Sequence, residues 1–344
     1  MTASVSVPRP SSDPERVLQR LDWTVVKRLD GLLQGDYRTL FRGFGLEMAE
    51  LREYQLTDDV RAIDWNVTAR LQTPWVRLFV EDRDITAWFL LDMSPSVDFG
   101  TPTARKRDLL VDFTAVLARL FTRHGNRVGA ILFNGAEARV VPAQAGRMHV
   151  LRLIKELRDY PRPVRAPRTD LASLLTSAMR IIGRRSLVFL VSDFLSVPGW
   201  DRLLAMVAHR HELLAVRLSD PFDGDLPDMG PLVLEDSETG EQLFVDTHDR
   251  RFRRRFAEIS AARRAELTGL MSRSGVDQLT LSLEGDLARD LVRFAAVRAQ
   301  RRTARAAFAG KAAPSGKAGE SWKTAESGKT VQSGKTVASG KAAS

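Results

Sequence analysis

Three oxygen-bearing side chains occupy alternate positions in the stretch 92–96. Asp92, Ser94 and Ser96 supply one carboxylate and two hydroxyls, and Pro95 stiffens the turn between the two serines. Mg²⁺ prefers oxygen ligands and keeps several waters, so it needs few direct carboxylates. The spacing therefore suits a divalent-cation site. The alternative is a polar turn whose hydroxyls cap the next helix.

The residues just before this turn indicate where it lies in the fold. Residues 85–91 form a short, almost continuous apolar run with aromatic side chains, typical of a strand buried on both faces of a parallel sheet. In open α/β sheets, ligands bind outside the carboxyl ends of the strands. Asp92 is thus expected at a ligand-binding edge.

Two further polar loops adjoin predicted element boundaries. Thr169 and Asp170 precede a helix expected to run to about residue 182, and Asp193 follows the apolar run 187–191. Asp193 repeats the placement of Asp92 at the end of a buried strand. We expect the two carboxylates to converge if their strands are neighbours in the sheet.

The alternation of strand and helix patterns from residue 85 predicts an α/β, doubly wound, mostly parallel sheet with a β-hairpin insertion near residues 231–246. The remaining strands are expected at 127–133, 138–141, 213–218 and 278–283, and the helices at 106–123, 148–157, 200–210, 249–274 and 287–299.

The flanks of this domain differ from it in composition. We predict a disordered segment at 1–15, an N-terminal extension at 16–84, the α/β domain at 85–300, and a disordered basic tail with Ser-Gly-Lys repeats at 301–344. The extension begins with a helix and continues as a segment rich in charged and aromatic residues. Its charges either pair across a solvated face or form a docking surface near the ion site.

Composition narrows the classes of function. The 344-residue chain is 44% hydrophobic and 28% charged and has no cysteine, which excludes disulfides and thiolate metal sites. It has neither a signal peptide nor an apolar run of about 20 residues, so a cytoplasmic protein is expected. Of its formal charge of +9, residues 301–344 carry +7. No specific nucleic-acid surface is predicted, and a weak electrostatic contact with nucleic acid or membrane is left to the tail.

Catalytic patterns are incomplete. The sequence lacks a Gly-x-Ser-x-Gly elbow and has five histidines, of which His209 and His211 form a pair without an evident third metal ligand. The Gly-Lys-Thr triplets of the tail lack the first glycine of a phosphate-binding loop. Asp92 is comparable with an aspartyl-phosphate nucleophile, but Ser94 stands where such a phosphatase needs its acid. We therefore expect no enzyme.

The five candidate ligands together resemble a known site. Asp92-x-Ser94-x-Ser96 with Thr169 and Asp193 is similar to the metal-ion-dependent adhesion site of von Willebrand factor A-type, Rossmann-type domains. Residues 35–220 resemble the bacterial domain-of-unknown-function family fifty-eight more specifically. The residues that carry this likeness are Arg52-Glu53-Tyr54, Asp58, Arg61, Ile63-Asp64-Trp65 and Ala69-Arg70. Thr57, Val97 and Arg168 depart from its usual pattern.

The resemblance implies roles for these residues. Ser94, Ser96 and Thr169 would bind Mg²⁺ or Mn²⁺ directly, Asp92 and Asp193 would act mainly through waters, and a partner's Asp or Glu would take an open position. Family members are typically encoded beside MoxR-type AAA+ ATPases, which implies a chaperone-like interaction module that helps such an ATPase assemble or activate another complex. Two alternatives stay open: a phosphatase-like, metal-dependent hydrolase using the same loops, and a vestigial site whose hydroxyls only cap loops.

Overall fold

The computed structural model describes residues 13–32, 50–55, 58, 60, 63, 65–78, 86–100, 104–135, 137–162, 168–236 and 238–311. Contacts divide the chain into residues 1–302 and 303–344. Of the second unit, the structure describes the end of the last helix.

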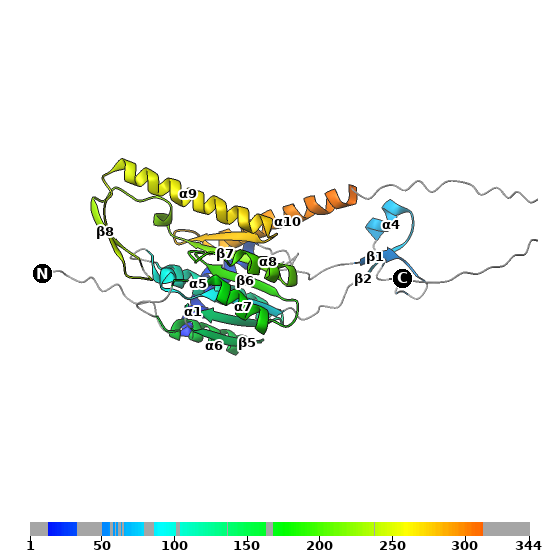
Figure 1. Cartoon of the computed structure of the whole chain (residues 1–344). Helices are drawn as coiled ribbons and strands as arrows, with labels where there is room; N and C mark the ends of the chain where they lie inside the picture. Colours follow the sequence, from blue (N-terminus) through cyan, green and yellow to red (C-terminus); the bar gives the residue numbers. More distant parts are fainter. Residues whose placement is uncertain are drawn as a thin grey trace, which may run out of the picture. The chain divides into compact units, whose positions relative to one another are not determined.

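A central sheet organises the first unit (Figure 1). In the described part of the chain it has six strands in the order β10-β7-β6-β3-β4-β5, and all pair in parallel except β5, which is antiparallel to β4. The strands are β3 (Thr86–Asp92), β4 (Arg127–Phe133), β5 (Ala138–Gln144), β6 (Leu187–Ser192), β7 (Glu212–Ser219) and β10 (Asp277–Ser282). The predicted doubly wound, mostly parallel sheet is confirmed.

Helices cover both faces of the sheet, because the strands are apolar on both sides. One apolar cluster includes side chains of α5 (Lys106–Arg123), α6 (Arg147–Asp159) and α10 (Leu287–Lys311), and the other those of α7 (Leu171–Ile181) and α8 (Asp201–Arg210). All six residues of β6 are buried, as are all of β3 except its first. The rings of Phe89 and Phe189 stack at 4.9 Å between these two central strands.

The predicted N-terminal helix is confirmed and begins earlier than expected. It consists of α1 (Pro14–Leu21), a π-helical stretch (Asp22–Val26) and α2 (Lys27–Leu32), and its apolar residues join the first cluster. Asp13 caps α1 by accepting a hydrogen bond from the Glu15 amide, so the predicted disorder of 1–15 is wrong for its last residues. Residues 1–12 lie outside the described part.

The charged and aromatic segment contains a small element of its own. Strands β1 (Glu50–Glu53) and β2 (Trp75–Leu78) pair antiparallel, and α4 (Trp65–Leu71) lies between them in sequence. Of the residues that carry the family likeness here, Arg61, Asp64 and the side chain of Arg52 lie outside the described part of the chain. The choice between a paired face and a docking surface therefore stays a prediction.

The insertion after β7 is a hairpin followed by a long helix. The hairpin strands β8 (Pro231–Glu235) and β9 (Gln242–Asp246) form a separate two-stranded sheet, which leads into α9 (Arg250–Arg273). The hairpin expected near residues 231–246 is confirmed.

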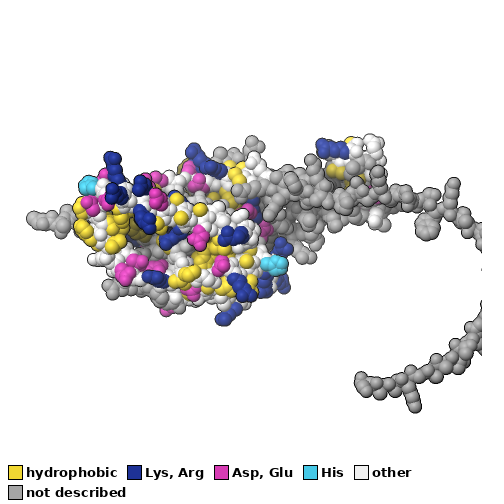
Figure 2. Space-filling view, turned by 45° about the horizontal axis from the view of Figure 1, so that its top comes forward, with side chains coloured by type: hydrophobic (Ala, Val, Ile, Leu, Met, Phe, Trp, Pro, Cys, Tyr) yellow, Lys and Arg dark blue, Asp and Glu magenta, His cyan; other side chains and the backbone are white. Residues whose placement is uncertain are grey.

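The last helix continues past the predicted start of the tail. α10 continues through Lys311, although a disordered tail was expected from residue 301, and residues 312–344 lie outside the described part. No helix among the described residues is long and apolar enough to cross a membrane. Figure 2 shows basic and acidic side chains interspersed over the visible folded surface, in keeping with the small net charge of residues 1–300.

Candidate functional site

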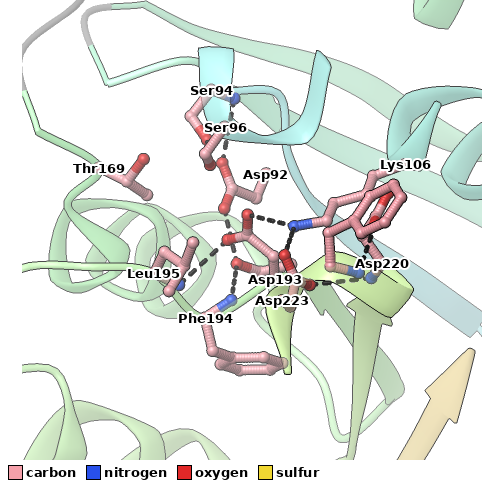
Figure 3. Close-up of polar contacts among 12 residues, drawn as sticks. Asp92, Ser94, Ser96, Lys106, Thr169, Asp193, Phe194, Leu195, Asp220 and Asp223 are labelled. Carbon is pink, nitrogen blue, oxygen red and sulfur yellow. Dashed lines mark hydrogen bonds and ion pairs between the residues drawn. The ribbon is translucent and has the colours of Figure 1, made fainter. Parts of the chain in front are cut away.

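The carboxyl ends of β3 and β6 bring the two predicted aspartates to one edge of the sheet (Figure 3). The strands are parallel neighbours with Leu91 opposite Val191, so Asp92 ends one strand beside Ser192 at the end of the other. The Ser192 hydroxyl donates a 2.6 Å hydrogen bond to Asp92 Oδ2. Strand order reverses between β3 and β6, which makes this the switch point where doubly wound sheets bind ligands.

The turn after β3 directs its two serines toward each other. The amide of Ser94 donates to Asp92 Oδ1 at 3.0 Å, and Pro95 opens a short 3₁₀ turn (Pro95–Asp98). The hydroxyl oxygens of Ser94 and Ser96 are consequently 3.0 Å apart. Asp92, Ser94 and Ser96 are 1%, 1% and 6% exposed, so burial holds these oxygens in a fixed arrangement.

Thr169 is held at this edge by the loop that follows β6. Its carbonyl accepts hydrogen bonds from the Ser196 hydroxyl (2.9 Å) and the Val197 amide (3.0 Å). Asp170 is the residue that caps α7, because its carboxylate accepts from the Ala172 amide. Thr169 is therefore not the helix cap, and Figure 3 shows it beside the Asp92, Ser94 and Ser96 group.

Asp193 lies in a tight turn next to a buried lysine. One carboxylate oxygen accepts from the Leu195 amide at 3.0 Å, and the other lies 3.5 Å from Lys106 Nζ. The same ammonium lies 3.0 Å from Asp223 Oδ1. Phe194 has φ of 61°, a left-handed conformation that is rare for a bulky residue and often marks a functional site.

The two strand-end carboxylates influence each other electrostatically. Burial and the negative charge of Asp193 raise the pKa of Asp92 to about 7, although hydrogen bonds from Ser192 and Ser94 act in the opposite direction. Lys106 offsets part of the charge of Asp193, and a cation bound at this edge would add positive charge beside Asp92.

The donor set fits a hard divalent ion. It combines two buried carboxylates with three buried hydroxyls, and all of these are oxygen ligands. Among the described residues, no group of three or more His, Cys, Asp or Glu side chains is placed to hold a metal. A cation at this edge would therefore depend on the hydroxyls of Ser94, Ser96 and Thr169.

Lys106 contacts the predicted ligand Asp193, Glu238 contacts Thr169, and Asp223 contacts Lys106, yet none of these charged residues was predicted as part of the site. A signal existed for Lys106, because helix amino termini favour acidic side chains and α5 begins with Lys106 and Arg107. Basic residues at that position indicate a specific anionic partner. Asp223 and Glu238 lie far along the chain in the segments after β7, where the local sequence gives no indication of their contacts.

The His209 and His211 pair does not form a second centre. His211 is buried, and burial lowers its pKa, whereas His209 is exposed on α8. The two rings thus lie in different environments.

Strand order and site together define the class of protein. If the six strands of the central sheet (β3, β4, β5, β6, β7 and β10) are numbered 1 to 6 in chain order, their order across the sheet is 3-2-1-4-5-6. The Asp-x-Ser-x-Ser turn lies at the switch point between strands 1 and 4, which are β3 and β6. This arrangement is a doubly wound α/β domain similar to von Willebrand factor A-type domains. Within this class, the chain belongs to the family described as "Protein of unknown function DUF58", which matches residues 50–266.

Relatives in mycobacteria support the assignment to this family. The chain is 40% identical over 283 residues to the uncharacterized protein Rv1480 of Mycobacterium tuberculosis, covering 82% of this chain and 88% of the relative. It is 39% identical over 164 residues to the uncharacterized protein MAV169 of Mycobacterium avium, covering 48% of this chain and 95% of the relative.

Two solved structures are among those similar to the chain. The conserved hypothetical protein BatB from Bacteroides thetaiotaomicron has 11% identity and a TM-score of 0.37, and covers 61% of this chain and 98% of its own. The SpRpn10 VWA domain has 12% identity and a TM-score of 0.36, and covers 61% of this chain and 94% of its own.

Proposed function

We propose that the chain is a divalent-cation-dependent protein-interaction module. Ser94, Ser96 and Thr169 would bind Mg²⁺ or Mn²⁺ directly, and Asp92 and Asp193 would hold its waters. The bound ion would bridge to a carboxylate of a partner protein, because hard cations accept further oxygen ligands. The observation that carries the proposal is the convergence of five buried oxygen side chains at the switch point between β3 and β6.

The proposed partner is a MoxR-type AAA+ ATPase, and the proposed process is the assembly or activation of another complex. This rests on the family to which the chain belongs, since the resemblance associates such proteins with those ATPases. A partner of this kind would present an exposed Asp or Glu to the site.

A hydrolase is less well supported by the geometry. Both carboxylate oxygens of Asp92 accept hydrogen bonds, from the Ser94 amide and the Ser192 hydroxyl, which makes the group a poor nucleophile. Two residues further on, where such a phosphatase needs its acid, stands Ser94, whose hydroxyl is no general acid. Phosphoester turnover that Asp92→Asn abolishes would favour the hydrolase over the interaction module.

Calorimetric titration of Mg²⁺ and Mn²⁺ into metal-free protein tests the site. We expect saturable binding that a Ser94→Ala, Ser96→Ala variant loses. A Ser177→Ala, Ser272→Ala variant is the matched control, because it removes two hydroxyls of α7 and α9 that are not among the candidate ligands. Absent binding, or equal binding in both variants, would contradict the proposal. A purified MoxR-type ATPase added with Mg²⁺ or with chelator tests the partner separately.

A further inference from the structure

The turn of the β8–β9 hairpin places a carboxylate directly on Thr169. The Thr169 amide donates to Glu238 Oε2 at 3.0 Å, and the Thr169 hydroxyl donates to the other oxygen of the same carboxylate. Thr169 is 1% exposed and Glu238 is half-buried, so the contact lies at the boundary between the buried site and the surface. One glutamate thus satisfies both donors of a residue that the proposed function assigns to the cation.

Hydrogen bonds within the turn hold Glu238 in this position. Asp236 accepts hydrogen bonds from the amides of Glu238 (2.8 Å) and Thr239 (2.9 Å), and these bonds lower the pKa of Asp236. Gly240 closes the turn with φ of 74°, a conformation that glycine adopts without steric cost. Little conformational freedom is therefore left for Glu238 to lose on binding.

The rest of the hairpin is attached loosely to the body. Val233, Leu243 and Phe244 are 59%, 60% and 71% exposed, so most of the hairpin makes little apolar contact. Its two ends are joined to each other at the base by Thr247, whose hydroxyl donates to the Gly230 carbonyl at 2.7 Å. An element held by a firm base and a polar tip contact can open locally without unfolding the sheet.

We propose that Glu238 is an intramolecular ligand that occupies the place of the partner's carboxylate. The inference rests on the proposed function, because it requires the edge formed by Ser94, Ser96 and Thr169 to accept a carboxylate. A partner must then present an acidic residue on a similarly tight turn and displace the hairpin. The contact lowers the affinity of the free chain for a partner. If the hairpin is closed nine-tenths of the time, the apparent affinity falls about tenfold.

The chain's own turn provides the probe for this proposal. A fluorescein-labelled peptide of residues 234–242 is the probe, and fluorescence anisotropy measures its binding. The full-length chain and its Glu238→Gln and Glu241→Gln variants are each titrated into the peptide, once in Mg²⁺ and once in chelator. Glu241 is the matched control, since it is an exposed glutamate of the same hairpin. We expect Glu238→Gln to bind the peptide about tenfold more tightly than the other two proteins, in Mg²⁺ only. A peptide carrying Glu238→Gln should not bind.

Hydrogen exchange at the Thr169 amide tests the contact itself. We expect faster exchange in Glu238→Gln than in the unmodified chain and in Glu241→Gln. The inference is overturned if exchange is equal in all three proteins, or if Glu238→Gln binds the peptide no better than the unmodified chain.

Calorimetry shows whether the role of Glu238 alone is wrong or the proposed cation site is wrong as well. If the Ser94→Ala, Ser96→Ala variant still loses Mg²⁺ binding, only the role of Glu238 is wrong. If no Mg²⁺ binds at all, the site and the intramolecular ligand fail together, and a change in Thr169 exchange then means only that Glu238 caps a loop.

Discussion

The ammonium of Lys106 lies 3.5 Å from the Asp193 carboxylate, and both side chains are 1% exposed. Asp223 completes the pairing at 3.0 Å from the same nitrogen. The candidate site thus contains a positive charge of its own, which offsets part of the cost of burying Asp193. A bound cation would share Asp193 with this lysine.

Removing that charge should destabilise the metal-free protein. We expect Lys106→Met to lower the free energy of unfolding by about 3–5 kcal/mol in chelator, because Asp193 is left buried without its counter-charge. Mg²⁺ should recover more stability in this variant than in the unmodified chain, since it supplies the missing positive charge. Urea denaturation with and without Mg²⁺ measures both effects. Lys155→Met, at an exposed position of α6, is the control. Equal destabilisation by the two variants would refute the explanation.

Asp92→Asn should have the opposite effect on the metal-free protein. Burial and Asp193 raise the pKa of Asp92 to about 7, so its ionised form is costly in the fold. A neutral amide of the same shape avoids that cost, and we expect the variant to be at least as stable in chelator. Mg²⁺ should then no longer raise its melting temperature. Asp201→Asn, on the exposed start of α8, should keep the Mg²⁺ response. A persisting response in Asp92→Asn would rule out Asp92 as part of the site.

The sequence was sufficient to predict the core of the fold. β3 and β6 are short apolar runs without helical periodicity; β3 ends in Asp92, and Asp193 directly follows β6. The helix Lys106–Arg123 was predicted to the residue, because its apolar spacing and the following glycine are local signals. Asp92 and Asp193 were expected to meet if their strands were neighbours, and they are.

The contacts that surround the ligands could not be predicted in this way. Glu238 lies 69 residues from Thr169, and Asp223 lies 117 residues from Lys106. Such pairs depend on where the insertion after β7 folds back, and nothing in the local pattern of either partner encodes that path. The helical extension of α10 beyond residue 300 was missed because its alanine and arginine residues lack a clear apolar stripe, although both favour helix.

Acid should weaken the fold through His149 in α6. Its Nε2 donates to the Val128 carbonyl at 2.7 Å, and its buried Nδ1 has no hydrogen-bond partner within the described residues. Burial lowers the pKa of His149 in the fold below its ordinary value of 6.5. The unfolded chain therefore binds more protons below that pH, and stability falls as the pH drops from about 6.5.

The measurement is a urea midpoint at pH values between 7.5 and 5. We expect His149→Gln to flatten the decline, by at most about 1.4 kcal/mol per pH unit, because its amide still donates to Val128 but does not titrate. His209→Gln, at an exposed position of α8, is the control. If the two variants show equal slopes, His149 does not cause the acid sensitivity.

Ser192 should position the candidate site although it is not a predicted ligand. Its hydroxyl donates to Asp92 Oδ2 at 2.6 Å and accepts from the Phe194 amide at 2.8 Å, so it joins the two strand ends and supports the left-handed Phe194. Residues that orient metal ligands typically change metal affinity by about 10–100-fold when removed. We expect Ser192→Ala to weaken Mg²⁺ binding within that range in calorimetry. Ser186→Ala is the control, since Ser186 lies just before β6 at its opposite end. Its hydroxyl donates one hydrogen bond, to the Arg184 carbonyl at 2.9 Å, and its removal should leave Mg²⁺ affinity unchanged. Equal Mg²⁺ affinities in the two variants would mean that the link between β3 and β6 contributes to stability alone.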